Sequence, residues 1–349
     1  MLLKDDSVVR LFANCIPVRG ARRSIVCDLY YQTYMFIPNI LYEILTTYPD
    51  KSVQEIKDIY DNRQDAHIDE YFSEILRRDL GFICEKKDIP HFPPLDLLWE
   101  RPEAITNSII DLDPTRPYDV RKVALELDSV GCKAVQVRIF PEIEPGFLVS
   151  VLEAFEFTRI EHIELLLKYS DALPEDELIK TCNIFHRVNA ITLHTSPMKE
   201  SKDINQSGVV LTFITEAVGS ATHCGVINPG LFNVNQENFL ESLRFNSCLN
   251  KKISVDVDGH VKNCPSMSTT YGHVSDTSFR EVVLQEDFRK LWGVTKDAVH
   301  ICQHCEFRYI CTDCRVYTQD LDVAYNKPLK CGYDPFQAKW DAAAQNSTL

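Results

Sequence analysis

Long apolar runs are missing from this 349-residue sequence. A membrane-spanning helix needs roughly 18 or more consecutive apolar residues, and no such stretch occurs, so we expect no membrane partner. The N-terminus, MLLKDDSVVR, has Lys4, Asp5 and Asp6 where a secretory signal would need its apolar core. Both absences predict a cytoplasmic protein.

An excess of positive charge is also missing. The chain carries 37 Lys and Arg against 51 Asp and Glu, which gives a net charge of −14. Because binding to a phosphate backbone needs clustered Lys and Arg, we expect no nucleic-acid partner. The motifs GxGxxG and GxxxxGK(S/T) are absent, so neither a dinucleotide fold nor a P-loop is indicated.

Cysteine, in contrast, is abundant and unevenly distributed. Of the 13 cysteines, five are scattered through the first 223 residues and eight lie between positions 224 and 331. These eight are Cys224, Cys248, Cys264, Cys302, Cys305, Cys311, Cys314 and Cys331. A reducing cytosol disfavours a disulfide framework, so this density indicates metal ligation. Eight thiolates would complete two four-cysteine sites, of zinc or of iron–sulfur clusters.

Residues 1–90 predict a small mixed domain with a winged-helix-like arrangement. β-prone runs at Arg23–Tyr31 and Gln32–Ile37 precede three helical patterns, and a strand is expected at Phe82–Cys84. Ser52 and Glu55 form a capping box at the second helix. With 12 basic and 15 acidic residues, this domain would repel phosphates. A peptide strand added to the hairpin edge is the better use, and a packing role without a ligand is the alternative.

Residues 100–223 alternate between strand and helix patterns. The strand candidates are Ile105–Leu112, Ala134–Phe140, Ile163–Lys168 and Ala190–His194, and the helical patterns are Val120–Val130, Phe147–Phe157 and Glu175–Phe185. This alternation predicts βα units on a parallel sheet, as a partial barrel or an open sheet. Near the strand ends lie Asp111, Asp113, His194 and Glu216, for which we expect surface or capping roles.

Residues 224–349 carry the metal-binding pattern. The run Cys302-x2-Cys305-x5-Cys311-x2-Cys314 places two close pairs within thirteen residues. Upstream, Asp258-Gly259 predicts a two-residue hairpin turn that brings Cys248 and Cys264 to one side. The spacing predicts a metal centre and leaves zinc and iron–sulfur both open.

The order Cys248-x10-Gly259-x4-Cys264, then the tight group, then Cys331, resembles the SPASM domain of radical S-adenosylmethionine enzymes that modify peptides. The resemblance covers about residues 224–335 and implies two auxiliary [4Fe–4S] clusters. It assigns Cys248, Cys264 and Cys314 to the first cluster, with Cys224 as the nearest unused thiol, and Cys302, Cys305, Cys311 and Cys331 to the second. The family usually has three residues between the last two cysteines of the tight group, whereas this chain has only Thr312 and Asp313.

The catalytic signature of that family is missing, because no CxxxCxxC occurs in the chain. Residues 100–223 are therefore expected to be a degenerate radical-SAM-like domain that does not bind or cleave S-adenosylmethionine. A SPASM chain without the radical cluster resembles the maturation protein of grasp-with-SPASM peptide systems. That resemblance implies two partners, a precursor peptide and an ATP-grasp ligase, and a leader-peptide recognition element in residues 1–90.

Two other functions stay open at this point, and no catalytic residue is identified. One is a peptide-modifying iron–sulfur oxidoreductase in its own right, with chemistry at an open iron of the first cluster. The other is a zinc-stabilised interaction module without chemistry.

Overall fold

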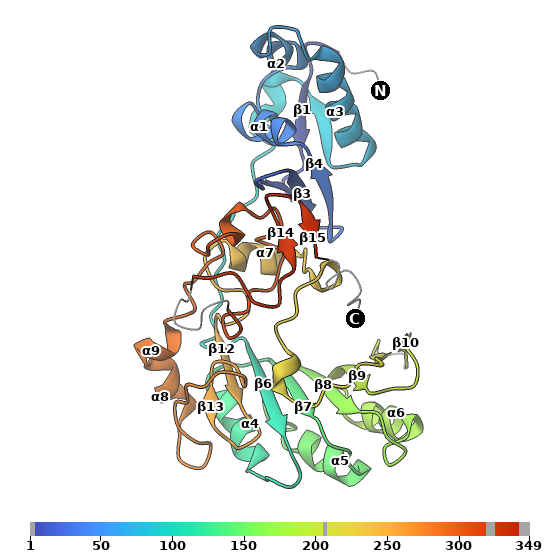
Figure 1. Ribbon diagram of the computed structural model, residues 1–349, viewed down its shortest axis with the longest axis vertical. Coiled ribbons are helices and arrows are strands. Elements are labelled where there is room, and N and C mark those ends of the chain that lie inside the picture. Colours follow the sequence, from blue (N-terminus) through green and yellow to red (C-terminus); the bar gives the residue numbers. More distant parts are fainter. Residues whose placement is uncertain (1–3, 205–207, 319–324, 342–349) are drawn as a thin grey trace.

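A computed structural model describes residues 4–204, 208–318 and 325–341 of the chain. Figure 1 shows three parts along the long axis. An N-terminal module (residues 4–91) lies at one end, and a large sheet with its helices lies at the other. A cysteine-rich region (residues 224–341) lies between them and adds two strands to the large sheet. Among the helices of the described residues, none has the length and apolar character needed to cross a membrane.

The N-terminal module combines two small antiparallel sheets with three helices. Strand β1 (Val8–Leu11) pairs with β5 (Gly81–Cys84), and β2 (Cys15–Val18), β3 (Ser24–Asp28) and β4 (Thr33–Ile37) form the other sheet. The helices are α1 (Asn39–Thr47), α2 (Val53–Ile59) and α3 (Asp65–Arg77), and a 3-10 turn, η1 (Lys86–His91), follows. The predicted capping box is confirmed, since the Ser52 N–H donates to Glu55 Oε2 at 2.8 Å and the Glu55 N–H donates to Ser52 Oγ at 3.3 Å.

Strand β3 is buried on both faces. Val26 faces the helices of the module and belongs to their apolar core. Ile25 and Cys27 point to the opposite face, because side chains alternate along a strand, and they pack with Phe307 of the cysteine-rich region. The three-stranded sheet is therefore the layer that joins the module to the rest of the molecule.

The large sheet has eight strands in the order β10-β11-β9-β8-β7-β6-β12-β13. The strands β6 (Asn107–Leu112), β7 (Ala134–Ile139), β8 (His162–Lys168), β9 (Val188–His194), β11 (Val210–Phe213) and β12 (Lys252–Val255) run parallel. At the two ends, β10 (Glu200–Asp203) and β13 (Val261–Lys262) are antiparallel to their neighbours. The protein is thus an α/β protein with a mixed, mostly parallel sheet.

Helices cover one face of this sheet (Figure 1). They are α4 (Val120–Ser129), α5 (Pro145–Glu153) and α6 (Glu175–Ile184), with α8 (Phe279–Leu284) beside α4. Alternate strand residues such as Val137 and Leu165 point into the apolar core under these helices. The opposite face of the same strands is polar and carries Gln136, Arg138 and Glu164. Parallel sheets are usually covered on both faces, so this polar face is unusual.

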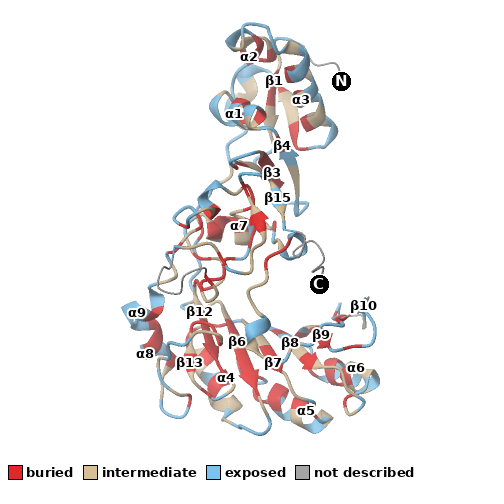
Figure 2. Ribbon diagram, in the orientation of Figure 1, coloured by how far each residue is buried: buried red, intermediate tan, exposed pale blue. Residues whose placement is uncertain are grey.

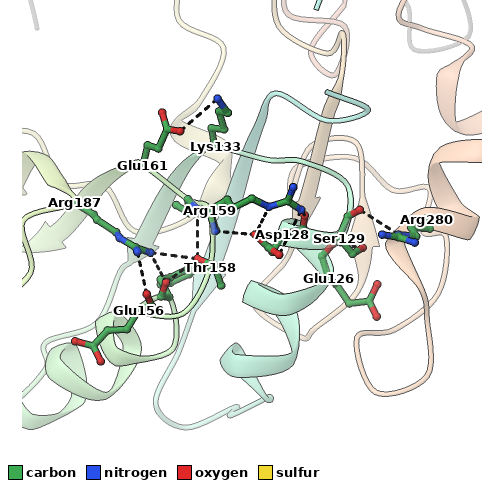
Figure 3. Close-up of polar contacts among 12 residues, drawn as sticks. Glu126, Asp128, Ser129, Lys133, Glu156, Thr158, Arg159, Glu161, Arg187 and Arg280 are labelled. Atoms are coloured by element: carbon green, nitrogen blue, oxygen red, sulfur yellow. Dashed lines mark hydrogen bonds and ion pairs between the residues drawn. The ribbon is translucent and has the colours of Figure 1, made fainter. Parts of the chain in front are cut away.

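A repeated arginine contact links successive βα units at the ends of their helices (Figure 3). Arg159 donates to the carbonyl of Asp128 at 2.6 Å, and Arg187 donates to the carbonyl of Glu156 at 2.9 Å. In both cases the arginine lies 31 residues after the carbonyl. Asp128 is in the last turn of α4 and Glu156 lies just after α5, so each arginine bonds its own unit to the unit before it.

Two features of the large sheet differ from the sequence expectation. The polar segment Glu200–Asp203 forms β10, which no apolar alternation predicts. The prediction of a two-residue turn at Asp258-Gly259 is wrong. The Asp256 N–H donates to the carbonyl of His260 at 3.0 Å, so these two residues are still paired across the hairpin. Three residues therefore form the turn, and Gly259 has a φ of 79°, the left-handed conformation that such a turn places on glycine.

The cysteine-rich region has little regular structure apart from β12 and β13. Its short elements are η2 (Ala221–His223, just before it), η3 (Pro229–Leu231), α7 (Gln236–Ser242), α9 (Glu286–Arg289) and η4 (Cys302–His304). A final pair, β14 (Tyr333–Asp334) and β15 (Lys339–Trp340), is antiparallel. Loops thus carry most of the predicted metal ligands.

Candidate metal centre

The first group of thiols consists of Cys224, Cys248, Cys264 and Cys314. Burial, together with the thiols of the other three members, raises the pKa of Cys248 to about 12, against the opposing charge of Lys252. Such mutual effects require short distances. Cys224 also raises the pKa of Cys264, after the larger effect of burial. The four thiols therefore form one electrostatic group.

Each member of this group comes from a different segment. Cys224 follows η2, Cys248 precedes β12, Cys264 follows β13, and Cys314 lies in a loop. A Cβ atom built on Gly225 would lie 2.8 Å from Cys314 Sγ, so only glycine allows the two segments to approach this closely. Strands β12 and β13 form the predicted hairpin, and Cys248 before it and Cys264 after it belong to the same group. The turn is one residue longer than predicted.

The second group consists of Cys302, Cys305, Cys311 and Cys331. Burial, together with Asp313, Cys311 and Cys331, raises the pKa of Cys302 to about 12, against the opposing charge of Lys296. Burial also raises the pKa of Cys305 well above its usual value, and Cys311 and Cys302 contribute to the shift. The eight cysteines thus fall into two electrostatic groups of four, whereas the resemblance implies three of the first group, without Cys224, and all four of the second. Metal ligation itself stays a prediction.

The two groups are neighbours, and the segment 311–314 belongs to both. Cys311 lies in the second group and Cys314 in the first, so the short Thr312-Asp313 spacer still reaches both. Asp313 is 1% exposed, and its carboxylate accepts from Asn246 Nδ2 at 2.7 Å and from Arg315 Nη2 at 2.5 Å. A second link between the groups is made by Lys330, the residue before Cys331. Its Nζ donates to the carbonyl of Cys224 at 2.7 Å.

A lysine lies beside each group. Lys296 is 5% exposed, and its Nζ donates to Cys311 Sγ at 2.9 Å. Burial alone would lower the pKa of Lys296, but Cys311, Asp313 and Cys302 outweigh it, so the pKa is raised and the ammonium stays charged. Lys252 Nζ lies 4.0 Å from Cys248 Sγ. These cations compensate the negative charge that thiolate ligands of a metal would carry.

The sulfurs of each group are not close enough to surround a single ion as they stand. Within the residues that the structure describes, no three of these cysteines have sulfurs all within 4.8 Å of one another. Four thiolates on one tetrahedral zinc, at a Zn–S distance of ~2.3 Å, would lie only about 3.8 Å apart. These sulfurs are therefore not gathered around one point, and zinc and iron–sulfur clusters both stay predictions.

One set of oxygen and nitrogen ligands does meet that distance, and it is explained by the hairpin. Asp256, Asp258 and His260 have ligand atoms within 4.8 Å of one another. Asp256 already pairs with Lys262 at 2.7 Å and accepts the N–H groups of Asp258 and His260 at 3.0 and 2.9 Å. The carboxylate therefore stabilises the turn.

A pocket of about 610 Å³ lies between the first group and the carboxyl ends of β6, β7 and β12. Its walls include Asp113, Arg116 and Lys262, together with Thr222 and Ser266, which lie within two residues of Cys224 and Cys264. The carboxyl ends of parallel strands are where α/β proteins usually place their sites. This pocket is the candidate substrate site nearest to the thiols.

The residues noted at the strand ends have different environments. Asp111 is 2% exposed and binds Arg138 through two hydrogen bonds of 2.6 and 2.8 Å, so its role is a buried ion pair rather than a surface or capping one. Asp113 accepts the N–H of Thr115 at 2.8 Å, as expected of a capping residue. Glu216 is exposed, as expected.

His194 is buried, contrary to a surface role. Its Nδ1 lies 2.9 Å from Thr195 Oγ1, and its Nε2 has no hydrogen-bond partner among the described residues. Burial lowers the pKa of His194 to about 4, with further effects of Lys168 and His223, so the imidazole is neutral at pH 7.

Sequence reasoning missed Arg138 and Lys296, two buried cations that interact with the thiols. Arg138 alternates with apolar residues in the strand Ala134–Ile139, as Gln136 does, so the pattern gave no signal that its side chain would be buried. The pKa of Arg138 is raised by its hydrogen bonds to Asp111 and by the charges of Asp111, Cys224 and Cys264, which outweigh burial. Lys296 gives no sequence signal either, because it lies in a loop of mixed composition.

The remaining five cysteines belong to apolar cores, and Cys27 shares one of them with Cys311 of the second group. Cys15, Cys27 and Cys84 are buried in the N-terminal module, and Cys132 and Cys182 are buried beside the helices of the large sheet. They act as small apolar residues in these cores.

Neither models of known protein families nor curated protein sequences match this chain.

Proposed function

We propose that this chain is a SPASM-type maturation protein of a ribosomally synthesised and post-translationally modified peptide system. It binds a precursor peptide in the cytoplasm, carries two auxiliary [4Fe–4S] clusters and acts with an ATP-grasp ligase. The observation that supports this most is the division of eight thiols into two adjoining groups of four, each beside a lysine.

In this proposal, Cys224, Cys248, Cys264 and Cys314 hold the first cluster and Cys302, Cys305, Cys311 and Cys331 hold the second. A bound cluster supplies folding free energy to its loops and can store one electron. Within the chain, Lys296 and Lys252 compensate ligand charge, and Asp313 holds the segment between Cys311 and Cys314 in place. A structural role suits a region with so little regular structure.

The large sheet is proposed to be a degenerate radical-SAM-like domain. After β6, where that family places its CxxxCxxC motif, this chain continues with Asp113 and Arg116, which line the pocket. Arg116 pairs with Asp258 of the hairpin at 2.8 Å. These charged residues are no ligands for a radical cluster, so we expect no cleavage of S-adenosylmethionine.

The N-terminal module is proposed to be a winged-helix-like leader-peptide recognition element. Among the described residues, β4 pairs with β3 alone, so its outer edge can accept an extended peptide by strand addition. Acidic residues on α3, including Asp69 and Glu74, disfavour DNA as the ligand.

Two rival functions have less support. An oxidoreductase with an open cluster iron needs a first site with only three thiols, whereas Cys224 lies with the other three. A zinc-stabilised module lacks the support of the SPASM resemblance, which implies iron–sulfur clusters, and metal content decides between the two.

The proposal is tested by reconstitution with a genomically adjacent ligase and precursor peptide. Purified anaerobically, the full chain should increase the rate at which the ligase changes the mass of the precursor, and deleting the leader should abolish this effect. The chain alone should leave the precursor mass unchanged. A mass change by the chain alone would favour the oxidoreductase, and release of 5′-deoxyadenosine would contradict the absence of radical chemistry.

A further inference from the structure

The loop 302–308 of the cysteine-rich region makes a large part of the contact with the N-terminal module, with Phe232 and Tyr333 beside it. The Ala21 N–H donates to the carbonyl of His304 at 2.7 Å. Arg308 Nη1 donates to the carbonyl of Arg19 and, at 3.0 Å, to that of Cys305. The backbone of the module and the backbone around the second thiol group are thus bonded to each other.

At the centre of this contact lies Glu306, whose side chain is 0% exposed. Its Oε1 accepts from Arg23 Nε of the module at 2.9 Å and from the Tyr333 hydroxyl at 2.5 Å. A Cβ at Gly20 would lie 2.9 Å from Oε2, so the module closes directly over the carboxylate. A buried carboxylate is strongly destabilising without its partners, so Arg23 and Glu306 depend on each other.

Aromatic packing completes the contact. The Phe307 ring centroid lies 5.6 Å from that of Tyr34 and 5.9 Å from that of Phe36 on β4. The guanidinium of Arg23 stacks over Phe36 at 3.6 Å. Two consecutive residues, Glu306 and Phe307, therefore supply the charged and the apolar halves of one interface.

The loop that presents these groups is a series of short turns closed by local backbone hydrogen bonds, such as that from the Cys305 N–H to the carbonyl of Cys302 at 2.9 Å. Its only regular structure is the single turn η4, and Ile301 before it has a φ of 68°, a conformation that β-branched residues rarely adopt. Cys302 and Cys305 of the second group lie on this turn and at its end. The module, by contrast, has its own apolar core of residues such as Ile44 and Phe72, separate from the interface.

We propose that the loop 302–308 is a metal-dependent clasp. With metal on the second group, the loop holds Glu306 and Phe307 against the three-stranded sheet and fixes the module in place. Without this metal the loop loses its shape and the module, still folded on its own core, is released. The clasp rests on the proposed function, because it needs a metal at the second group, and it makes the position of the peptide-binding module responsive to cluster loading.

The test is hydrogen exchange of the full-length chain, measured together with iron content. Cys305→Ala removes a ligand of the second group, and Cys248→Ala is the matched variant in the first group. Arg23→Ala breaks the clasp without touching a ligand, and Arg78→Ala is its control, since Arg78 is exposed on the same module and pairs with Glu74 at 2.9 Å. The reporter is the segment 19–23, which includes the bonded Ala21 amide, and helix α3 reports whether the module stays folded.

In Cys305→Ala we expect loss of half of the iron and about tenfold faster exchange at residues 19–23, with α3 unchanged, since undocking is a local opening. Cys248→Ala should lose as much iron and keep the wild-type exchange. Arg23→Ala should keep all its iron and exchange faster, unlike Arg78→Ala. Unchanged exchange in Arg23→Ala, or in Cys305→Ala once its iron is lost, contradicts the clasp and leaves the proposed function unaffected. A wild-type chain without iron contradicts the proposed function as well.

Discussion

The large sheet and the cysteine-rich region are stabilised in different ways. Figure 2 shows buried residues along the strands of the sheet, where the apolar side chains pack under the helices. In the cysteine-rich region many buried groups are charged or polar, and Lys296, Glu306 and Asp313 are all at most 5% exposed. Buried charges need fixed partners, and loops cannot fix them alone. We therefore expect the sheet to fold on its apolar surface, and we propose that the loops depend on a metal at the thiols.

Removal of metal should separate the two regions most clearly. Binding free energies of structural metal sites reach about 10 kcal/mol, so their loss exceeds the effect of any single side chain. After anaerobic treatment with an iron chelator, residues 300–335 should lose protection in hydrogen exchange while strands β6–β9 keep theirs. Simultaneous loss of protection in both regions would show that the sheet has no stability of its own.

Arg138→Ala should have the next largest effect, at the border between the regions. The substitution leaves Asp111 buried without its partner, which costs about 3 to 5 kcal/mol. Urea unfolding followed by circular dichroism would measure the loss. The matched control is Arg159→Ala, whose guanidinium binds Asp128 at the surface and should change stability by less than about 1 kcal/mol.

Acidification should weaken the sheet region through His194. The imidazole titrates near pH 6.5 in the unfolded chain and near 4 in the folded one, so below pH 6.5 the unfolded state binds the extra proton. This contribution to stability is present above pH 6.5 and is lost as the pH falls toward 4, to a total of about 3 kcal/mol. Between pH 7 and 5, unfolding free energies of wild type and His194→Gln should therefore converge. Parallel pH profiles would contradict a buried neutral imidazole.

Ser52→Ala should have the smallest effect, in the separate core of the N-terminal module. Loss of the capping box on α2 costs about 1 kcal/mol. The expected result is faster exchange within α2, with unchanged iron content and unchanged exchange in the clasp. A fall in iron content would mean that the module and the thiol groups fold as one unit.

The sheet was easier to predict from the sequence than the cysteine-rich region, because an apolar core leaves a local pattern and buried polar contacts do not. Strands β6, β7 and β8 were predictable because apolar periodicity is a local property, and the structure has them within two residues of the expected bounds at each end. Strand β10 and the pairing of β12 with β6 were not, because both depend on contacts between distant segments. Cysteine spacing identified the eight thiols, but their division into groups came from a family resemblance, and spacing carries no information on Lys296 or Glu306 beside them.

The most direct test of the account is the metal content of the full chain purified without oxygen. Two [4Fe–4S] clusters predict a brown protein with about eight irons and eight acid-labile sulfides per chain. Cys302→Ala should retain about half of both, since one group stays intact. A colourless protein that binds zinc in stoichiometric amounts, and takes up no iron on anaerobic reconstitution, would contradict the central claim.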